Sequence, residues 1–199
     1  MSLFPKIIWR LSDENIYLTF DDGPDKNITP RLLNLLNKHE IKATFFVVGQ
    51  KAERHPETVL QIHQNNHVIG NHSYTHPHLI FKSKGIIKEE IQRTDKILLE
   101  ITGKHPTLFR PPYGQFGLAV LSVLKSTNHR MVLWNASPQD YKADASIQRI
   151  QARMKKHLRP GKIVLMHDGH SHSPHMLGAL ENILEKIKEQ GLKFSALLN

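Results

Sequence analysis

Two neighbouring carboxylates are the first residues of this sequence with a type and spacing suited to chemistry. Asp21 and Asp22 stand side by side where an apolar run ends, and Gly23-Pro24 follows them. Adjacent carboxylates repel each other, so keeping both ionised requires a cation or a shared proton. A metal ion on one and a proton-transfer role for the other would resolve that conflict. An Asp-Gly-Pro turn without any function is the alternative interpretation.

A pair of histidines forms the second candidate segment. His72 and His76 are four residues apart, and on a helix two imidazoles at this spacing lie on one face and can share a cation. The sequence contains 14 histidines, so chance pairs at this spacing are also expected.

The third segment is Arg110-Pro111-Pro112-Tyr113-Gly114. Arg110 is able to hold a carboxylate through bidentate hydrogen bonds. The two prolines stiffen the loop, which leaves the backbone N–H of Tyr113 free to face a developing oxyanion. A rigid turn with a surface arginine would have the same sequence.

Asp140 and His167 complete the set of candidates. His167 ends an apolar run, and Asp140-Tyr141 comes a few residues after Trp134. A histidine titrates near neutral pH, so it is suited to general-acid catalysis, and a nearby aspartate raises its pKa.

The elements around these residues alternate between short β-rich runs and longer helical stretches. Ala43–Val48 is almost uniformly apolar, which is typical of a parallel strand buried on both faces. Strands are predicted at Ile16–Phe20, Ala43–Val48, His67–Gly70, Thr107–Phe109, Arg130–Trp134, Ile163–Met166 and Lys193–Leu197. Helices are predicted at Arg31–His39 (N-cap Thr29), Pro56–Asn65, Ser83–Thr102, Gly117–Ser126, Ala145–Leu158 (N-cap Asp144) and Pro174–Gln190.

The candidate residues share one place relative to these strands. Each lies at or just beyond the carboxyl end of a predicted strand, the rim where a parallel β/α barrel gathers its catalytic loops. This favours a deformed (β/α) barrel of seven or eight parallel strands, similar to a TIM barrel, over a doubly wound open sheet. The residues concerned are Asp21, Asp22, His72, Arg110, Asp140 and His167.

Asp22, His72 and His76 together offer two imidazoles and one carboxylate to a divalent ion. Such a set suits a zinc hydrolase and also a non-haem iron oxygenase. The sequence has no cysteine, which excludes a thiolate metal site. The spare base Asp21 and the spare acid His167 favour metal-assisted hydrolysis.

With these residues the chain resembles the polysaccharide deacetylase family, the NodB-homology carbohydrate esterases of family 4. The resemblance runs from about Ile16 to Leu197, and its motifs stand in family order at Thr19–Pro24, His72–His76, Arg110–Tyr113, Asp140-Tyr141 and Leu165–His167. It implies a deformed barrel and a hydrolase of linear amides. The expected reaction removes N-acetyl groups from N-acetylglucosamine-containing glycans of the chitooligosaccharide or peptidoglycan type.

The resemblance also assigns a role to each matching residue. Asp21 corresponds to the catalytic base, oriented by Arg110, and His167 to the catalytic acid, tuned by Asp140. Zn²⁺ is the expected metal, with Co²⁺ or Ni²⁺ as alternatives. The ligands that match the family are Asp22, His72 and His76, and the substrate side comprises Tyr113 (through its backbone N–H), Pro112, Leu165 (in the acetyl pocket) and Tyr141.

Two features depart from the family pattern. Ser137 and Tyr141 stand where many relatives carry an aspartate and a tryptophan, which affects the shape of the substrate groove. His170, His172 and His175 crowd the loop after His167, as either a solvated loop or a second metal site. An O-acetyl esterase acting on xylan-like glycans and a catalytically silent glycan-binding protein stay open as alternatives.

Length and charge set the remaining expectations. The 199 residues correspond to one domain at 16–199, preceded by an extension at 1–15. The net charge of +9 favours an anionic partner, but the densest basic cluster lacks aromatic residues, so no nucleic-acid partner is expected. No apolar run approaches the roughly 18 residues of a membrane span. The first residues do not resemble a secretory leader, which favours the cytoplasm, whereas the expected substrate favours the cell envelope. The sequence does not predict the oligomeric state.

Overall fold

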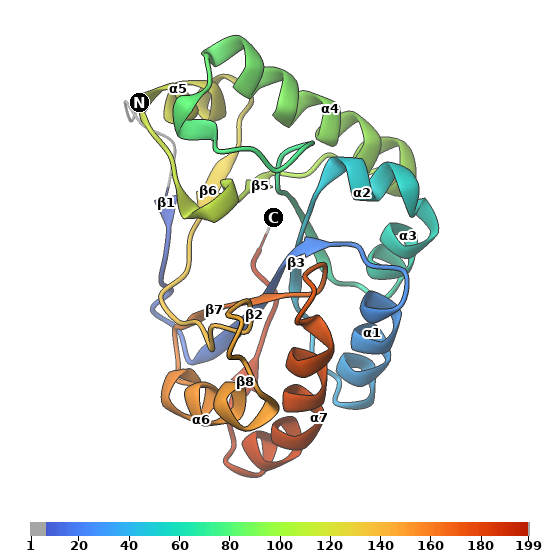
Figure 1. Ribbon diagram of the computed structural model, residues 1–199, viewed down its shortest axis with the longest axis vertical. Helices are drawn as coiled ribbons and strands as arrows, with labels where there is room; N and C mark the ends of the chain where they lie inside the picture. The colour runs from blue at the N-terminus through green and yellow to red at the C-terminus, as the bar shows by residue number, and fades with distance from the viewer. Residues whose placement is uncertain (1–6, 199) are drawn as a thin grey trace.

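Strands that all pair in parallel form the centre of the computed structural model, which describes residues 7–198 (Figure 1). Their order in the sheet is β1-β6-β5-β4-β3-β2-β7, and β8 pairs with β2. A parallel bridge between Ala136 and Val164 brings the segment after β6 beside β7 and closes the sheet into a ring. The predicted deformed (β/α) barrel is therefore confirmed. The strands are β1 (Ile7–Ile8), β2 (Asn15–Gly23), β3 (Thr44–Val47), β4 (Val68–Asn71), β5 (Leu108–Phe109), β6 (Arg130–Val132), β7 (Ile163–His167) and β8 (Lys193–Phe194).

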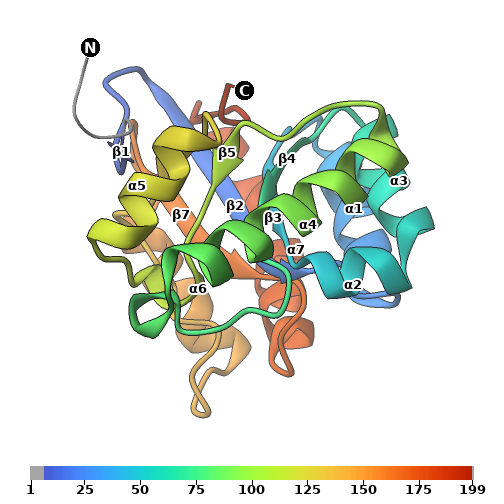
Figure 2. The same ribbon diagram turned by 90° about the horizontal axis from the view of Figure 1, so that it is seen from above.

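Helices surround the outside of this sheet, as two perpendicular views show (Figures 1 and 2). All six predicted helices are present, and the short helix α2 at Gly49–Arg54 is an addition. No helix among the described residues combines the length and the apolar character that crossing a membrane requires. The helices are α1 (Ile28–Lys38), α2 (Gly49–Arg54), α3 (Pro56–Gln64), α4 (Lys84–Thr102), α5 (Leu118–Ser126), α6 (Ile147–His157) and α7 (Ser173–Glu189), with short 3₁₀ turns η1 (Leu79–Phe81) and η2 (Pro112–Gly114).

Strand β2 shows how the two-residue repeat of a strand divides the core. Leu18 and Phe20 point outward and pack in the cluster that the helices cover, and the ring of Phe20 stacks on that of Phe45 at 5.1 Å. Tyr17 belongs instead to a second cluster, with Phe46 and residues of β5, β6 and β7. Because side chains alternate along a strand, Thr19 and Asp21 share the face of Tyr17 and lie inside the barrel.

The C-terminal segment packs at the end of the barrel where the strands begin, and β1 joins the sheet beside β6. Leu197 is buried, and its N–H donates to the Thr44 hydroxyl at 3.0 Å. Arg130 donates to the carbonyl of Leu198 at 2.6 Å. Part of the predicted extension at 1–15 also joins the sheet, because β1 pairs with β6; residues 1–6 of that extension lie outside the described residues.

Two predicted helix caps are wrong. Helix α6 is capped by the Ser146 hydroxyl, which accepts from the Arg149 N–H at 3.3 Å, while Asp144 pairs with the Arg149 side chain. Helix α1 begins at Ile28, and its first N–H groups donate to the Asp25 carboxylate rather than to Thr29. In both cases a neighbouring residue of similar capping ability lies closer to the free N–H groups.

Candidate active site

A bulge at the end of β2 brings two consecutive carboxylates into one pocket. The register with β3 shifts between Asp21 and Gly23, and Asp22 has a left-handed backbone with φ +68°. In a regular strand, neighbouring side chains point to opposite faces, so the irregular backbone is what lets Asp22 join Asp21. Lys51 holds this turn in place, because its Nζ donates to the carbonyl of Asp22 at 2.7 Å and to that of Gly169 at 2.8 Å.

His72 and His76 converge on Asp22 from the loop after β4. His72 Nε2 lies 3.4 Å and His76 Nε2 3.1 Å from Asp22 Oδ1. The segment is not the helix that the four-residue spacing suggested; left-handed residues at Ser73 (φ +64°) and His76 (φ +58°) turn the loop back on itself. The predicted ligands are therefore together, although the backbone that gathers them differs from the expected one.

The donor atoms of this cluster fit a divalent cation. His72 Nδ1 donates to the Arg110 carbonyl at 2.7 Å, so in the neutral ring Nε2 carries the lone pair. That lone pair faces Asp22, and Asp21 Oδ2 is 3.7 Å away, an arrangement that a cation between them resolves. Among the described residues this is the one group of at least three potential ligands, all within 4.8 Å of one another. Two imidazoles and a carboxylate suit zinc, cobalt or nickel.

Arg110 fixes the position of Asp21. Its side chain is fully buried, and Nη1 donates to Asp21 Oδ1 at 2.7 Å and to the Thr19 hydroxyl at 2.8 Å. The remaining nitrogens donate to carbonyls at the end of β6, and the guanidinium lies 4.1 Å from the centre of the Phe46 ring. A buried guanidinium with all its partners in place holds a carboxylate rigidly.

His167 and Asp140 form a buried pair on the other side of the pocket. Asp140 Oδ1 accepts from His167 Nδ1 at 3.0 Å, and Oδ2 accepts from the backbone N–H of the same residue at 2.8 Å. Burial lowers the pKa of His167, but the hydrogen bond and charge of Asp140, with further contributions from Asp21 and Asp22, outweigh it and raise the pKa to about 9. His167 is therefore protonated at neutral pH, with Nε2 as its second proton-bearing atom.

The third motif brings a backbone donor to the same pocket. Tyr113 has a left-handed backbone with φ +60°, and its N–H donates to no other residue in the described part of the chain. The next residue, Gly114, lies against the Trp134 ring, where an added Cβ would be 2.6 Å from the ring. Five of the eight non-glycine residues with positive φ between 7 and 198 lie on the loops of this pocket, as is usual where strain serves function.

The pocket itself has a volume of about 260 Å³. It contains most of the predicted site residues; Arg110 and Asp140 are buried and contact the lining residues Asp21 and His167, and Pro112 is buried without lining the pocket. Trp134 and His170 are additional lining residues; the position of Trp134 at the end of a predicted strand was the available signal. The lining residues are Asp21, Asp22, His72, His76, Tyr113, Trp134, Tyr141, Leu165, His167 and His170.

The departures from the family pattern affect the wall rather than the acid–base pair. The Ser137 hydroxyl accepts from the Gln139 N–H at 3.1 Å and does not line the pocket. The Tyr141 ring stands edge-on to His167, with ring centres 5.4 Å apart. Of the three histidines after His167, His170 and His172 lie on the loop, whereas His175 lies in the first turn of α7 and donates Nδ1 to the Ala145 carbonyl at 2.7 Å. They do not form a metal-binding group among the described residues.

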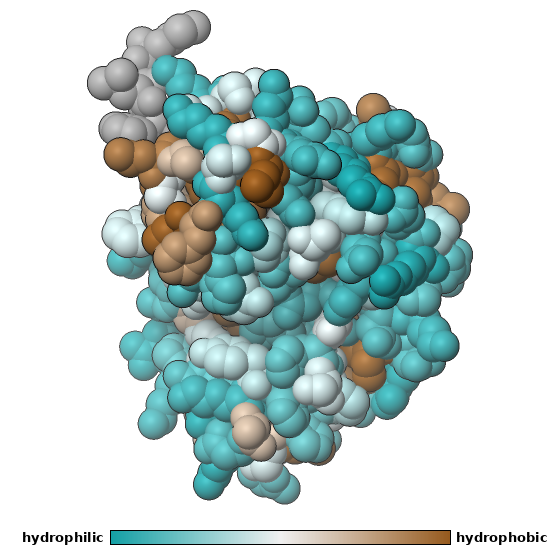
Figure 3. All heavy atoms as spheres, turned by 45° about the horizontal axis from the view of Figure 1, so that its top comes forward, coloured by the Kyte–Doolittle hydropathy of each residue, from teal (hydrophilic) through white to brown (hydrophobic). Residues whose placement is uncertain are grey.

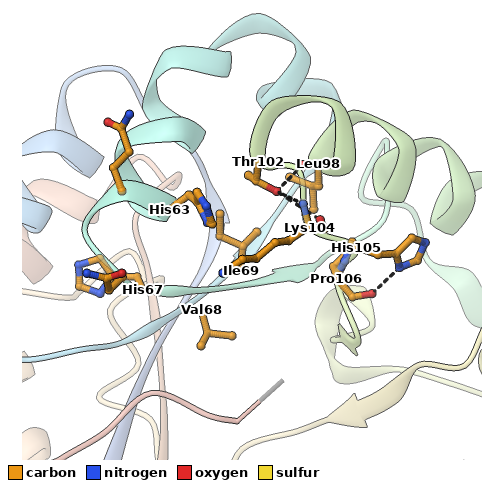
Figure 4. Close-up of a pocket in the computed structure, with 11 residues that line it drawn as sticks. His63, His67, Val68, Ile69, Leu98, Thr102, Lys104, His105 and Pro106 are labelled. Carbon is orange, nitrogen blue, oxygen red and sulfur yellow. Dashed lines mark hydrogen bonds between the residues drawn. The ribbon is translucent and has the colours of Figure 1, made fainter.

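A second cavity of about 360 Å³ lies at the opposite end of the barrel, beside the start of β4 and the end of α4 (Figure 4). Three histidines, His63, His67 and His105, line it together with Lys104, but no carboxylate does. His67 Nδ1 accepts from the Ala43 N–H at 3.1 Å, and its Nε2 is buried without a hydrogen-bond partner among the described residues.

Comparisons with known proteins agree with the fold. The polysaccharide deacetylase family model matches residues 10–132. A peptidoglycan-N-acetylglucosamine deacetylase of Bacillus cereus is 36% identical over 183 residues, which is 92% of this chain and 66% of the relative. A crystal structure of a peptidoglycan N-acetylglucosamine deacetylase in complex with 4-naphthalen-1-yl-N-oxidanyl-benzamide superposes with a TM-score of 0.92 at 33% identity, covering 97% of this chain and 91% of the other. A family 4 pseudoenzyme from Bacillus anthracis has a TM-score of 0.88 at 30% identity, covering 99% and 68% of the two chains.

Proposed function

The chain belongs to the polysaccharide deacetylase family, and we propose that it is a zinc-dependent hydrolase that removes N-acetyl groups from N-acetylglucosamine-containing glycans of the chitooligosaccharide or peptidoglycan type. The observation that carries this proposal is the pocket that places a carboxylate base and a protonated histidine beside one cluster of metal ligands. Metal-assisted hydrolysis of an amide uses these three components.

Asp21 is the proposed base. Asp22, His72 and His76 would hold the zinc ion, which supplies Lewis-acid chemistry by polarising the attacking water and the acetyl carbonyl. Asp21 Oδ2 lies on the side of this cluster, 3.7 Å from His72 Nε2, while Arg110 occupies Oδ1. Oδ2 accepts the proton of the water as its oxygen bonds to the acetyl carbon.

His167 is the proposed acid. The C–N bond breaks as His167 Nε2 gives its proton to the amine nitrogen, which leaves as a neutral amine, while acetate keeps the new C–O bond. Asp140 holds the ring through Nδ1 and favours its protonated form. The backbone N–H of Tyr113 donates to the oxyanion of the tetrahedral intermediate, and Leu165 provides an apolar wall for the acetyl methyl group.

Family membership alone does not secure turnover, since a pseudoenzyme has nearly the same fold. The completeness of the site in this chain argues against a silent glycan-binding protein, because a binder has no need of a buried acid–base pair around a metal cluster. An O-acetyl esterase would use the same residues; an alkoxide leaves more easily than an amine, so it would depend less on His167.

Acetate release from an N-acetylglucosamine oligomer tests the proposal. We expect release by the protein as prepared, loss after chelation, and recovery after zinc is restored. The Asp21→Asn variant is the matched control, because it keeps the metal ligands and lacks the base. Absence of release in every sample would contradict N-deacetylation, and release from O-acetylated glycans alone would favour the esterase.

A further inference from the structure

A row of aromatic rings leads from the metal cluster to the outer surface. The ring of His76 stands edge-on to Tyr113 with centres 4.7 Å apart, and Tyr113 stacks face to face on His78 at 3.9 Å with planes 11° apart. The ring of Phe81 follows, 6.5 Å from that of His78. The first two residues belong to the active site, while His78 and Phe81 have no part in the reaction described above.

The His78 ring is held in place although it is exposed, and Phe81 is fixed through its backbone. Phe81 is 83% and Tyr113 52% exposed. His78 is fixed by the stack on Tyr113 and by a contact of its Nδ1 with Gln115 Oε1 at 3.1 Å. Leu79 anchors the turn in the core, and the Phe81 N–H donates to the His78 carbonyl at 3.3 Å.

We infer that His78 and Phe81 form a binding subsite for a sugar ring of the glycan that lies at least two residues along the polymer from the one that is deacetylated. The inference rests on the proposed function and extends it along the polymer. Aromatic faces carry partial negative charge and attract the C–H groups that cover one face of a pyranose ring. Preorganised rings lose little conformational freedom when such a ligand binds.

The arrangement favours a sugar over a protein partner. The rings form a line that starts at the reacting centre, and Tyr113 lines the pocket and also stacks on the first ring of the subsite. On the face that Figure 3 shows, hydrophobic side chains form small separate patches on a mostly hydrophilic surface. A stable protein interface needs a larger continuous patch.

The test compares a dimer and a hexamer of N-acetylglucosamine as substrates for Phe81→Ala and His78→Ala. We expect each variant to raise KM for the hexamer by about 3- to 10-fold, to change KM for the dimer by less than about 2-fold, and to keep kcat for the hexamer within about 2-fold. Leu99→Ala is the matched control, because Leu99 is 42% exposed and lies near the far end of α4. An effect of the same size on both substrates, or none on either, would overturn the inference.

Binding of the hexamer separates a failure of this inference from a failure of the proposed function. Calorimetry with the Asp21→Asn protein measures affinity without turnover. If the parent releases no acetate but the hexamer binds, and Phe81→Ala weakens this binding about 3- to 10-fold, the subsite stands and deacetylation does not. Hexamer binding that Phe81→Ala leaves intact, or no binding at all, rules the subsite out.

Discussion

His67 is buried and His167 largely buried, at opposite ends of the same barrel, and their pKa values move in opposite directions. His167 donates Nδ1 to Asp140, and although burial opposes it, its pKa rises to about 9. His67 has no carboxylate partner; burial, with a smaller contribution from Lys42, lowers its pKa to about 4. Between these two residues the difference is the partner: His67 is buried without a carboxylate and is neutral, whereas Asp140 keeps His167 protonated.

The same contrast holds for the two groups of histidines. His72 and His76 converge on Asp22, with both Nε2 atoms within 3.4 Å of one carboxylate oxygen. His63, His67 and His105 line a larger cavity that has no carboxylate in its wall (Figure 4). His105 of this second group lies 3.9 Å from Asp95, but the three histidines share no carboxylate in the described part of the chain. In a chain with 14 histidines, the convergence of two imidazoles on one carboxylate oxygen is what distinguishes the site that can do chemistry.

The largest effect on activity is expected from the loss of a metal ligand. His72→Ala removes one of three ligands and should abolish both stoichiometric zinc binding and acetate release, because the remaining imidazole and carboxylate leave an incomplete site. His63→Ala is the matched control in the other histidine group and should keep both properties. The measurements are metal content after dialysis and acetate release. Full zinc content in His72→Ala would refute the ligand assignment.

The next largest effect on activity is expected from the loss of the proton donor. His167→Ala should lower kcat for an N-acetylated substrate by about 10²- to 10⁴-fold, since an amine leaves poorly without a proton. The decrease should be smaller for an O-acetylated substrate. Zinc content should stay at the parent level, which distinguishes this variant from the ligand variant. Turnover near the parent level would show that His167 is not the acid.

The pH profile provides the control for that assignment. A general acid must be protonated, so the kcat of the parent should fall as the pH rises through the pKa of His167, which the surrounding carboxylates raise to about 9. A bound cation would move this limb to lower pH, because it disfavours the charged ring. Asp140→Asn should shift this fall in kcat to still lower pH. An unchanged pH profile would mean that the titrating group is not His167.

The sequence predicts which residues meet in the site better than it predicts the backbone conformation that brings them together. The positions of the strands can be predicted because they depend on hydrophobic patterning. Since parallel strands end at one rim of the barrel, these positions predict that Asp21, His72, Arg110 and His167 lie together. The bulge at Asp22 depends on contacts made across the chain, including the Lys51 bonds to the Asp22 and Gly169 carbonyls. Such distant contacts leave no local pattern.

The convergence of His72 and His76 is the clearest example of a correct prediction with a wrong reason. The four-residue spacing suggested one face of a helix, whereas left-handed turns at Ser73 and His76 produce the same meeting of side chains. Left-handed backbone at non-glycine residues has no reliable signature in sequence. The stiffness of the two prolines predicts the free N–H of Tyr113. It does not predict the left-handed backbone of that residue, whose φ is +60°.

The smallest expected effect concerns the structural histidine and acts on stability. Because the folded pKa of His67 is about 4 and the unfolded value is 6.5, the unfolded chain binds more protons between these values. The free energy of unfolding should therefore fall as the pH drops from 7 to 5, with a contribution from His67 of about 2 kcal/mol. His67→Gln retains an acceptor for the Ala43 N–H but cannot titrate, so its stability should fall by about 2 kcal/mol less over this range. Urea unfolding at both pH values measures the difference. Equal losses in the two proteins would mean that His67 is protonated in the fold, and the contrast with His167 would then not rest on the missing carboxylate.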